Sequence, residues 1–213
     1  MAPTTQITIP VDDVTLPGDL TVPDDPRGLV VFAHGSGSSR KSPRNQFVAE
    51  QLVDRGLATL LFDLLTEAED RDRDNRFDID LLTDRLLAAT EHVEGRDDVG
   101  DLPVGYFGSS TGAAAALRAA GRRPERIGAV VSRGGRVDMA ADAFDAVAAP
   151  TRLVVGGADT QVLTWNRDAA QDLACETEVT VVEGAGHLFE GEGELEAVAE
   201  YAAEWFVEHL TSA

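Results

Sequence analysis

The sequence is short of cysteine, of lysine and of long hydrophobic runs. A single cysteine, Cys175, excludes a disulfide within the chain and is typical of a reducing cytoplasm. No apolar run approaches the roughly 18 residues of a membrane span. The first residues show neither the basic nor the apolar segment of a signal peptide. We therefore expect a cytoplasmic protein with no membrane partner.

Basic residues are scarce as well, and nearly all of them are arginine. The formal net charge is −20, which disfavours nucleic acid as a partner because phosphates would be repelled. Lys41 is the only lysine among the 18 basic residues, and the others are arginine. This composition is typical of proteins from salt-loving archaea, since about 1 M salt shortens the screening length to about 3 Å. We expect a halophilic protein, with an ordinary acidic protein as the alternative.

The chain is long enough for one domain with a sizeable core, which we expect to span residues 1–213. Residues 6–23 predict two short strands with a turn at Pro17-Gly18. Six short apolar runs without alternation follow, as expected of parallel strands buried on both faces. These runs are Leu29–Ala33, Ala58–Phe62, Val104–Phe107, Ile127–Val131, Arg152–Val155 and Val179–Val182.

Helical patterns separate these runs. Four helices are predicted. The first begins at Ser42-Pro43, the second and third span about 78–93 and 110–120, and the last has an apolar face from Leu195 to Leu210. Strand-helix alternation predicts an α/β fold with a mostly parallel central sheet and helices on both faces. The charged segment from Leu64 to Phe77 is the longest expected loop. We interpret it as a solvated excursion, with a flap over a site as the alternative.

Functional residues of such sheets lie beyond the carboxyl ends of the strands, and one strand there leads into GSSTG. In this G-x-S-x-G pattern Ser110 is central, and the strand-turn-helix context predicts a nucleophile elbow. The flanking glycines are expected because the strained serine leaves no room for bulk nearby. A phosphate-binding loop is the rival interpretation, but the stretch has neither a Walker lysine nor G-x-G-x-x-G.

A serine nucleophile needs a base and an orienting acid. Asp159 follows one predicted strand within GGADTQV, and His187 follows the next within GAGHLF. The order Ser110, Asp159, His187 is that of the α/β-hydrolase triad. A non-catalytic binding module would not require all three together.

Other candidates fit the triad less well. His92 and His209 fall within predicted helices, and His34 precedes the serine in the chain. Asp63 also ends a strand before the serine, and we expect it to anchor loop amides instead.

An oxyanion hole is expected from HGSG, which directly follows the first parallel strand within VVFAHGSGSSR. Its small residues allow backbone N–H groups to face the site, and the amide of Thr111 is the second expected donor. No cluster of His, Cys and carboxylates has the spacing of a metal site, and the chemistry requires no cofactor.

Taken in order, HGSGSS, GSSTG, GGADTQV and GAGHLF resemble an α/β hydrolase, most closely the small members of the dienelactone hydrolase family. The resemblance covers Leu29 to Leu210. It implies Ser110 as nucleophile, His187 as base, Asp159 as acid, and oxyanion amides from Ser36 and Thr111. Dienelactone hydrolases proper carry cysteine as the nucleophile, whereas this chain has serine.

These features predict a serine hydrolase that cleaves a small ester or lactone at an open site with a minimal lid. An acyltransferase or peptidase on the same triad, or a non-catalytic binding module, are the alternatives. Arg40, Arg133 and Arg136 follow strand ends or the HGSGSS turn. Their guanidinium groups suit a substrate carboxylate, or they pair with surface Asp and Glu.

Overall fold

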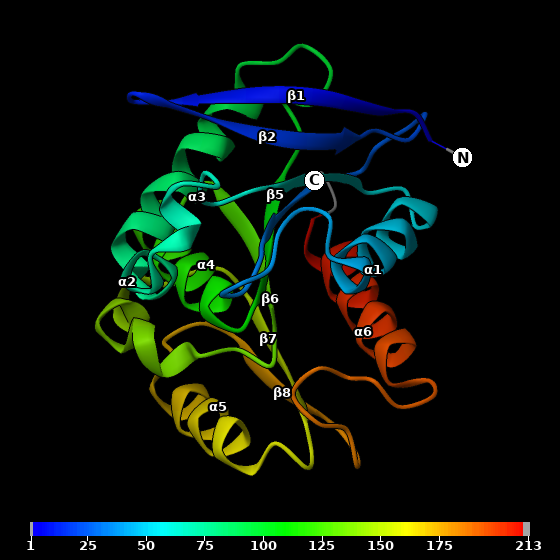
Figure 1. Ribbon diagram of the computed structural model, residues 1–213. Coiled ribbons are helices and arrows are strands. Elements are labelled where there is room, and N and C mark those ends of the chain that lie inside the picture. The colour runs from blue at the N-terminus through cyan, green and yellow to red at the C-terminus, as the bar shows by residue number, and fades with distance from the viewer. Residues whose placement is uncertain (1, 211–213) are drawn as a thin grey trace.

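A computed structural model describes residues 2–210, which form an eight-stranded sheet between two layers of helices (Figure 1). Along the sheet the order is β1-β2-β4-β3-β5-β6-β7-β8. Strands β3 to β8 run parallel, while β1 and β2 are antiparallel additions at one edge. The strands are β1 Thr4–Val11, β2 Val14–Thr21, β3 Leu29–Ala33, β4 Ala58–Phe62, β5 Val104–Ser109, β6 Ile127–Arg133, β7 Thr151–Gly156 and β8 Thr177–Val182.

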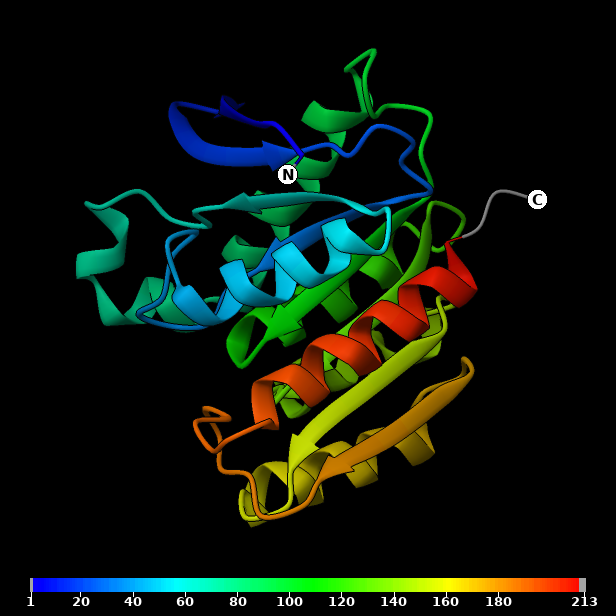
Figure 2. The same ribbon diagram turned by 90° about the vertical axis from the view of Figure 1, so that its right-hand side faces the viewer.

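Helices cover both faces of the sheet, which confirms the predicted fold class. One face carries α3 (Ile79–Glu94), α4 (Thr111–Arg122), α5 (Thr160–Asp172) and the 3-10 segment η2 (Val137–Ala146). The other carries α1 (Pro43–Asp54) and α6 (Glu194–His209), which lie side by side across the sheet (Figure 2). None of the helices within residues 2–210 is long and apolar enough to cross a membrane.

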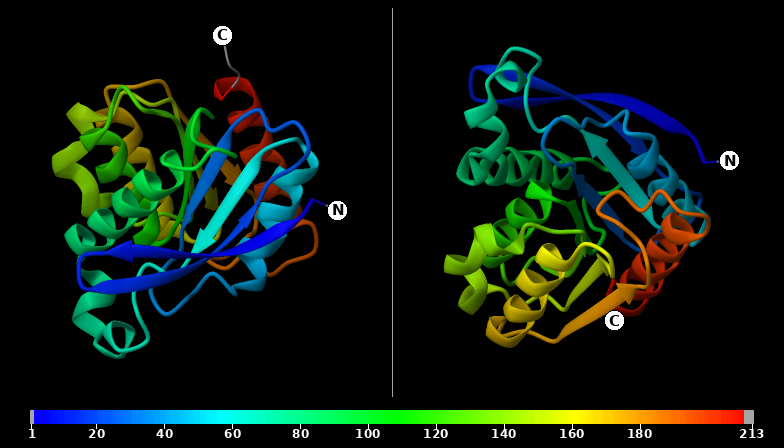
Figure 3. Two further views of the ribbon diagram at one scale, coloured as in Figure 1. Left: turned by 90° about the horizontal axis from the view of Figure 1, so that it is seen from above. Right: turned by 60° about the horizontal axis from the view of Figure 1, so that its bottom comes forward.

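The predicted apolar runs form the core strands. Every residue of β3, β4 and β5 is buried, as continuous apolar sequence predicts for strands covered on both faces. Strand β8 is only half-buried because it lies at the edge of the sheet, opposite the β1–β2 hairpin (Figure 3).

The prediction for the first turn is wrong. The hairpin turns at Asp12-Asp13, where Asp12 takes a positive φ of 48°, and Pro17 and Gly18 lie inside β2. Glycine fits closely at position 18 for a different reason. A Cβ at this position would lie 3.1 Å from Ile7 Cγ1 and 3.2 Å from Leu60 Cδ1, both on neighbouring strands. Pairing with two strands therefore outweighs the local turn preference.

The segment 64–77 is more ordered than the predicted loop. It contains the 3-10 turn η1 (Glu69–Arg71) and the short helix α2 (Arg73–Phe77), whose first turn is capped by Asp72. Asp72 and Asp74 bring carboxylates to this helix start, where the backbone favours negative charge.

Three glycines of the sheet, at positions 28, 105 and 128, let the end of α6 pack close to it. A Cβ at Gly28, Gly105 or Gly128 would lie within 3 Å of Phe206 or Leu210 side-chain atoms. Both of these large side chains are almost fully buried. The glycines just before β3 and within β5 and β6 thus set how closely α6 can pack on the sheet.

Candidate active site

Ser110 lies on the sharp turn between β5 and α4, in a strained backbone conformation. Its φ of 51° and ψ of −120° are rarely adopted by a residue with a side chain. The flanking glycines are sterically required, as predicted. A Cβ at Gly108 would lie 2.4 Å from Ala113 Cα, and one at Gly112 would meet the Ala33 carbonyl. Strand β5 and helix α4 can meet at this angle only with glycine on both sides.

His187 and Asp159 form a close pair on the neighbouring strand ends. The two atoms His187 Nδ1 and Asp159 Oδ2 are 2.7 Å apart. A carboxylate only accepts, so Nδ1 carries the proton and Nε2 is left as the basic nitrogen. The turns that carry the two residues are fitted to each other, since Ala158 N–H donates to the Ala185 carbonyl at 2.9 Å.

The turn 133–136 connects Ser110 with this pair. Ser110 N–H donates to the Arg133 carbonyl at 3.3 Å, and Arg136 N–H donates to the Ser110 carbonyl at 3.0 Å. Gly134 lies against the imidazole, because a Cβ there would be 3.4 Å from His187 Nδ1. Within the described residues 2–210, the Ser110 hydroxyl makes no hydrogen bond to His187. Such bonds are often long without substrate, and the shared turn places both residues on one rim.

The HGSG loop packs directly on the serine. A Cβ at Gly35 would lie 3.0 Å from Ser110 Cβ and 3.1 Å from the Ser109 carbonyl oxygen. Ser36 N–H, expected to serve an oxyanion, donates to the Thr111 hydroxyl at 2.9 Å. The two predicted oxyanion residues are therefore adjacent, and the Thr111 oxygen occupies the Ser36 amide in this structure. That hydroxyl contact was not anticipated from the sequence.

His34 holds this loop against segment 64–77. Its Nε2 accepts from Leu64 N–H at 3.0 Å, so Nδ1 is protonated and donates to the Gly35 carbonyl at 3.0 Å. Burial lowers the pKa of His34, which keeps the ring neutral as this arrangement requires. Sequence reasoning considered His34 only for the triad and missed this positioning role.

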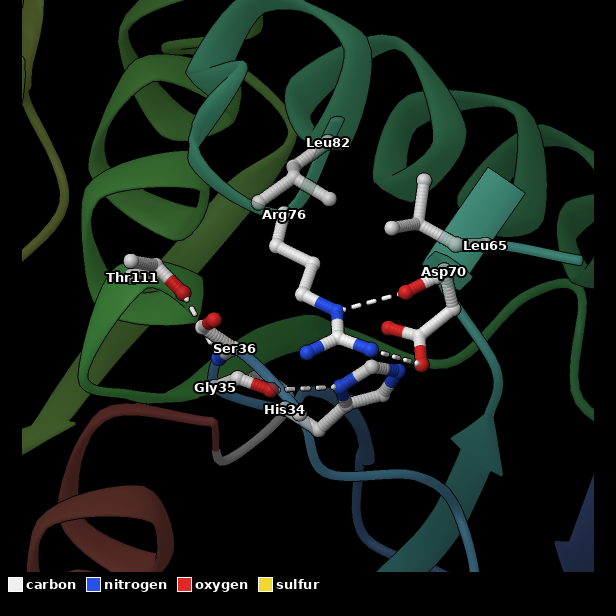
Figure 4. Close-up of a pocket in the computed structure, with 9 residues that line it drawn as sticks. His34, Gly35, Ser36, Leu65, Asp70, Arg76, Leu82 and Thr111 are labelled. Atoms are coloured by element: carbon white, nitrogen blue, oxygen red, sulfur yellow. Dashed lines mark hydrogen bonds and ion pairs between the residues drawn. The ribbon is translucent and has the colours of Figure 1, made fainter. Parts of the chain in front are cut away.

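A small cavity opens beside the HGSG loop. Figure 4 shows Arg76 entering it from α2, with its Nε and Nη2 bound to Asp70 and the remaining nitrogen facing the loop. Its further lining includes Gly35, Ser36, Leu65 and Thr111. The 64–77 segment thus borders the candidate site, and the charge run was the signal in the sequence.

The structure separates the three arginines suggested for substrate binding. Arg40 pairs with Asp63 and Asp19, and Arg136 makes two hydrogen bonds to Asp138 while stacking on Trp165. Arg133 is buried, and within residues 2–210 its guanidinium has no acidic partner and no aromatic ring against it.

The rival triad residues have other surroundings. Asp63 accepts Arg40 N–H at 2.7 Å, which confirms the expected anchoring of a loop amide. His92 lies in α3, and the His209 ring packs at a tilt against Trp205 at the end of α6. No group of three or more His, Cys, Asp or Glu side chains in the described chain could hold a metal ion.

Comparison with known proteins agrees with this architecture. The family model for the alpha/beta hydrolase fold matches residues 28–175. A crystal structure of a dienelactone hydrolase from Anabaena variabilis is 50% identical, with a TM-score of 0.96 over 98% of this chain and 99% of that one. Est1E from Butyrivibrio proteoclasticus shares the fold at 18% identity, with a TM-score of 0.82 over 96% of this chain and 98% of that one.

A curated relative from Mycobacterium tuberculosis, provisionally named a phosphoribosyl transferase, is 53% identical over 205 residues. These residues make up 96% of this chain but 46% of that protein, so the chain spans less than half the length of the curated relatives it matches. The sheet, the elbow and the family match agree, and the chain belongs to the α/β-hydrolase family as a dienelactone-hydrolase-like member.

Proposed function

We propose that this protein is a serine hydrolase that cleaves small esters or lactones through an acyl-enzyme. The observation that supports this most is the pairing of two features on one rim. Ser110 has the strained elbow conformation, and the Asp159–His187 hydrogen bond leaves Nε2 free to act as a base. A hydrolase also agrees with the family and with the dienelactone hydrolase among its structural relatives.

In this mechanism His187 Nε2 takes the hydroxyl proton as Ser110 Oγ attacks the ester carbonyl carbon. Asp159 holds the imidazole tautomer and stabilises the imidazolium. The carbonyl π electrons move to oxygen, where the amides of Thr111 and Ser36 receive the charge, the latter by leaving the Thr111 hydroxyl. His187 then gives its proton to the leaving alcohol, and a water that it activates releases the acid and regenerates the serine.

Small substrates suit the dimensions of the site. The cavity beside the HGSG loop is open to solvent and has room for only about one water molecule, so it would not enclose a long acyl chain. No large lid covers the strand ends in the described chain, since the connection from β6 to β7 is taken up by η2, which packs on α4. We propose short acyl groups rather than long lipid chains.

A cytoplasmic, high-salt setting belongs to the same proposal. The free cysteine suits a reducing compartment, and the acidic surface suits concentrated salt. An acyltransferase or peptidase on the same triad remains the second candidate, because it would use the same residues. The name phosphoribosyl transferase belongs to a protein of which this chain matches 46%.

Covalent labelling tests the nucleophile directly. A fluorophosphonate probe in high salt should label the wild-type protein and the Ser109→Ala variant, but not Ser110→Ala. Ser109 is the matched control, because it is the adjacent serine at the end of β5. Labelling that persists in Ser110→Ala, or that is absent from wild type, would contradict the proposal. Adding alcohol or amine acceptors to an ester assay separates hydrolysis from acyl transfer.

A further inference from the structure

Asn166 is a fully buried polar residue that connects helix α5 to the turn 133–136. It is 0% exposed, and its Nδ2 donates to two carbonyl oxygens, that of Val162 at 2.8 Å and that of Gly135 at 2.9 Å. Its Oδ1 has no hydrogen-bond partner within residues 2–210. Burying an amide oxygen without a partner costs free energy, which an apolar side chain of the same size would avoid. The donation by Nδ2 is therefore what distinguishes asparagine from leucine at this position.

The bond to Val162 lies within α5 and does not require an amide. In α3, the hydroxyl groups of Thr83 and Thr90 make the equivalent bond to the carbonyl four residues earlier, at 2.6 and 2.8 Å. A hydroxyl at position 166 would serve the same purpose. The bond to Gly135 is different, because it leaves the helix and joins segments 31 residues apart in the chain.

The bond to Gly135 reaches Ser110 through a single peptide group. The Gly135 carbonyl and the Arg136 N–H belong to the same peptide group, and that N–H donates to the Ser110 carbonyl at 3.0 Å. A trans peptide group is planar, with its C=O and N–H pointing in opposite directions, so holding the oxygen also aims the N–H. The Ser110 carbonyl accepts Ala113 N–H as well, at 3.1 Å, so both of its lone pairs are used. Asn166 is thus two hydrogen bonds away from the proposed nucleophile.

A second peptide group holds the other side of Ser110. The Arg133 carbonyl accepts the Ser110 N–H at 3.3 Å. In the same peptide group, Gly134 N–H donates to the Val154 carbonyl of β7 at 2.8 Å. This second clamp consists of backbone, whereas the clamp on the Ser110 carbonyl depends on the Asn166 side chain. A strained conformation such as the φ of 51° at Ser110 persists where the surrounding structure fixes it from several sides.

Helix α5 also carries the proposed acid. Asp159 directly precedes α5, and Asn166 follows it by about two helical turns. The tie from Asn166 to the turn 133–136 therefore links the helix that begins after Asp159 to the turn that holds Ser110. His187 is bound to Asp159, and its ring lies against Gly134 of that turn.

We propose that Asn166 is a positioning residue for the hydrolase reaction. Its amide holds the Gly135–Arg136 peptide group, and thereby the strained turn at Ser110, in a fixed place relative to the proposed base. This inference rests on the proposed function and adds to it a residue that does not touch the substrate. Without the amide, the Ser110 hydroxyl would reach the attacking position less often. The loss should therefore fall on kcat and spare KM.

Two substitutions of Asn166 separate this role from simple space filling. Asn166→Leu keeps a similar volume and removes both bonds, whereas Asn166→Thr keeps a hydroxyl for the Val162 carbonyl and removes the bond to Gly135. Each should lower kcat for a short p-nitrophenyl ester by about 10- to 100-fold, with KM within about 3-fold of wild type. The rate of fluorophosphonate labelling should fall in parallel with kcat. Because Asn166→Thr preserves the bond within the helix, it carries the test if Asn166→Leu does not fold.

Thr90→Val is the matched control. It deletes a fully buried hydroxyl that bonds the Leu86 carbonyl and the Tyr106 hydroxyl, on α3 and β5. Urea unfolding in high salt should show a loss of stability, while kcat stays within about 2-fold of wild type. An equal fall of kcat in Thr90→Val and in the Asn166 variants would overturn the proposal, because activity would then follow stability alone.

Amide hydrogen exchange tests the clamp independently of hydrolysis. In both Asn166 variants the Arg136 N–H should exchange at least about 10-fold faster than in wild type, and in Thr90→Val it should stay within about 2-fold. If wild type neither hydrolyses esters nor is labelled, while exchange still responds to Asn166, the hydrolase is overturned and the clamp on Ser110 stands. In an active wild-type protein, an unchanged kcat in Asn166→Thr, a change in KM alone, or unchanged exchange at Arg136 would overturn the positioning role.

Discussion

Gly35→Ala should impair catalysis more than stability, because the added methyl group falls between the HGSG loop and Ser110, the proposed nucleophile. The new Cβ would lie 3.0 Å from Ser110 Cβ and 3.1 Å from the Ser109 carbonyl oxygen. Favourable carbon–carbon contacts lie at about 3.5–4.0 Å. Neither neighbour is the end of a flexible side chain, so the loop has to move away by about half an ångström.

The size of the effect follows from that displacement. A misplacement of about 1 Å costs about 100-fold in rate, and loss of one oxyanion donor costs about 100- to 1,000-fold. For half this shift we expect a 10- to 100-fold fall in kcat. Overpacking typically costs about 1–3 kcal/mol, partly offset by the lower entropy of an unfolded chain with alanine. The free energy of unfolding should therefore fall by only about 1–2 kcal/mol.

Gly186→Ala is the matched control. Gly186 directly precedes His187, has an ordinary φ, and would have nothing within 4 Å of an added Cβ. Its kcat should stay within about 2-fold of wild type, and its stability within about 0.5 kcal/mol.

Short-chain p-nitrophenyl esters give kcat and KM, and urea unfolding in high salt gives the stability of each variant. Wild-type kcat in Gly35→Ala, together with the expected loss of stability, would refute the reasoning. The loop would then have moved without consequence for the reaction, and the HGSG segment would not form the oxyanion hole.

Three further outcomes are expected. Asp159→Asn should fold normally but lose about 10⁴-fold in kcat, because an amide does not hold the required histidine tautomer; a loss below about 10-fold would remove Asp159 from the triad. The melting temperature should rise from dilute to multimolar KCl as the acidic surface is screened, and an unchanged value would contradict a halophilic protein. His34 has a folded-state pKa below its usual 6.5, so the unfolded chain binds its proton first as pH falls. Wild-type stability should therefore drop below about pH 6.5 more steeply than that of His34→Gln, and parallel unfolding curves against pH would show that the ring contributes nothing.

The central strands and the sharp turn at Ser110 could be predicted because each has a strong local signal. Continuous apolar runs identify strands buried on both faces, and G-x-S-x-G at a strand end implies the elbow that Ser110 adopts. Features that depend on partners distant in sequence could not be predicted. The fit of Gly18 between Ile7 and Leu60 is set by two other strands, and it replaced the expected turn.

Side-chain pairing is equally hidden from the sequence. The chain has many acidic residues that could pair with any one arginine. Nothing in the local sequence therefore distinguishes Arg136, which forms an ion pair, from Arg133, which does not within residues 2–210. Helix α5 was missed because only a few of its positions, among them Val162, Leu163 and Ala169, are apolar and buried. The donation from Ser36 to the Thr111 hydroxyl crosses 75 residues and becomes visible only in the folded chain.

The three glycines beneath the end of α6 have a consequence for folding during synthesis. Phe206 and Leu210 can dock only on Gly28, Gly105 and Gly128 once the strands near these glycines are already aligned. During synthesis that surface therefore stays bare until almost the whole of this segment has left the ribosome. A nascent chain stalled before α6 would expose the apolar centre of the sheet, which makes it a target for chaperones and proteases.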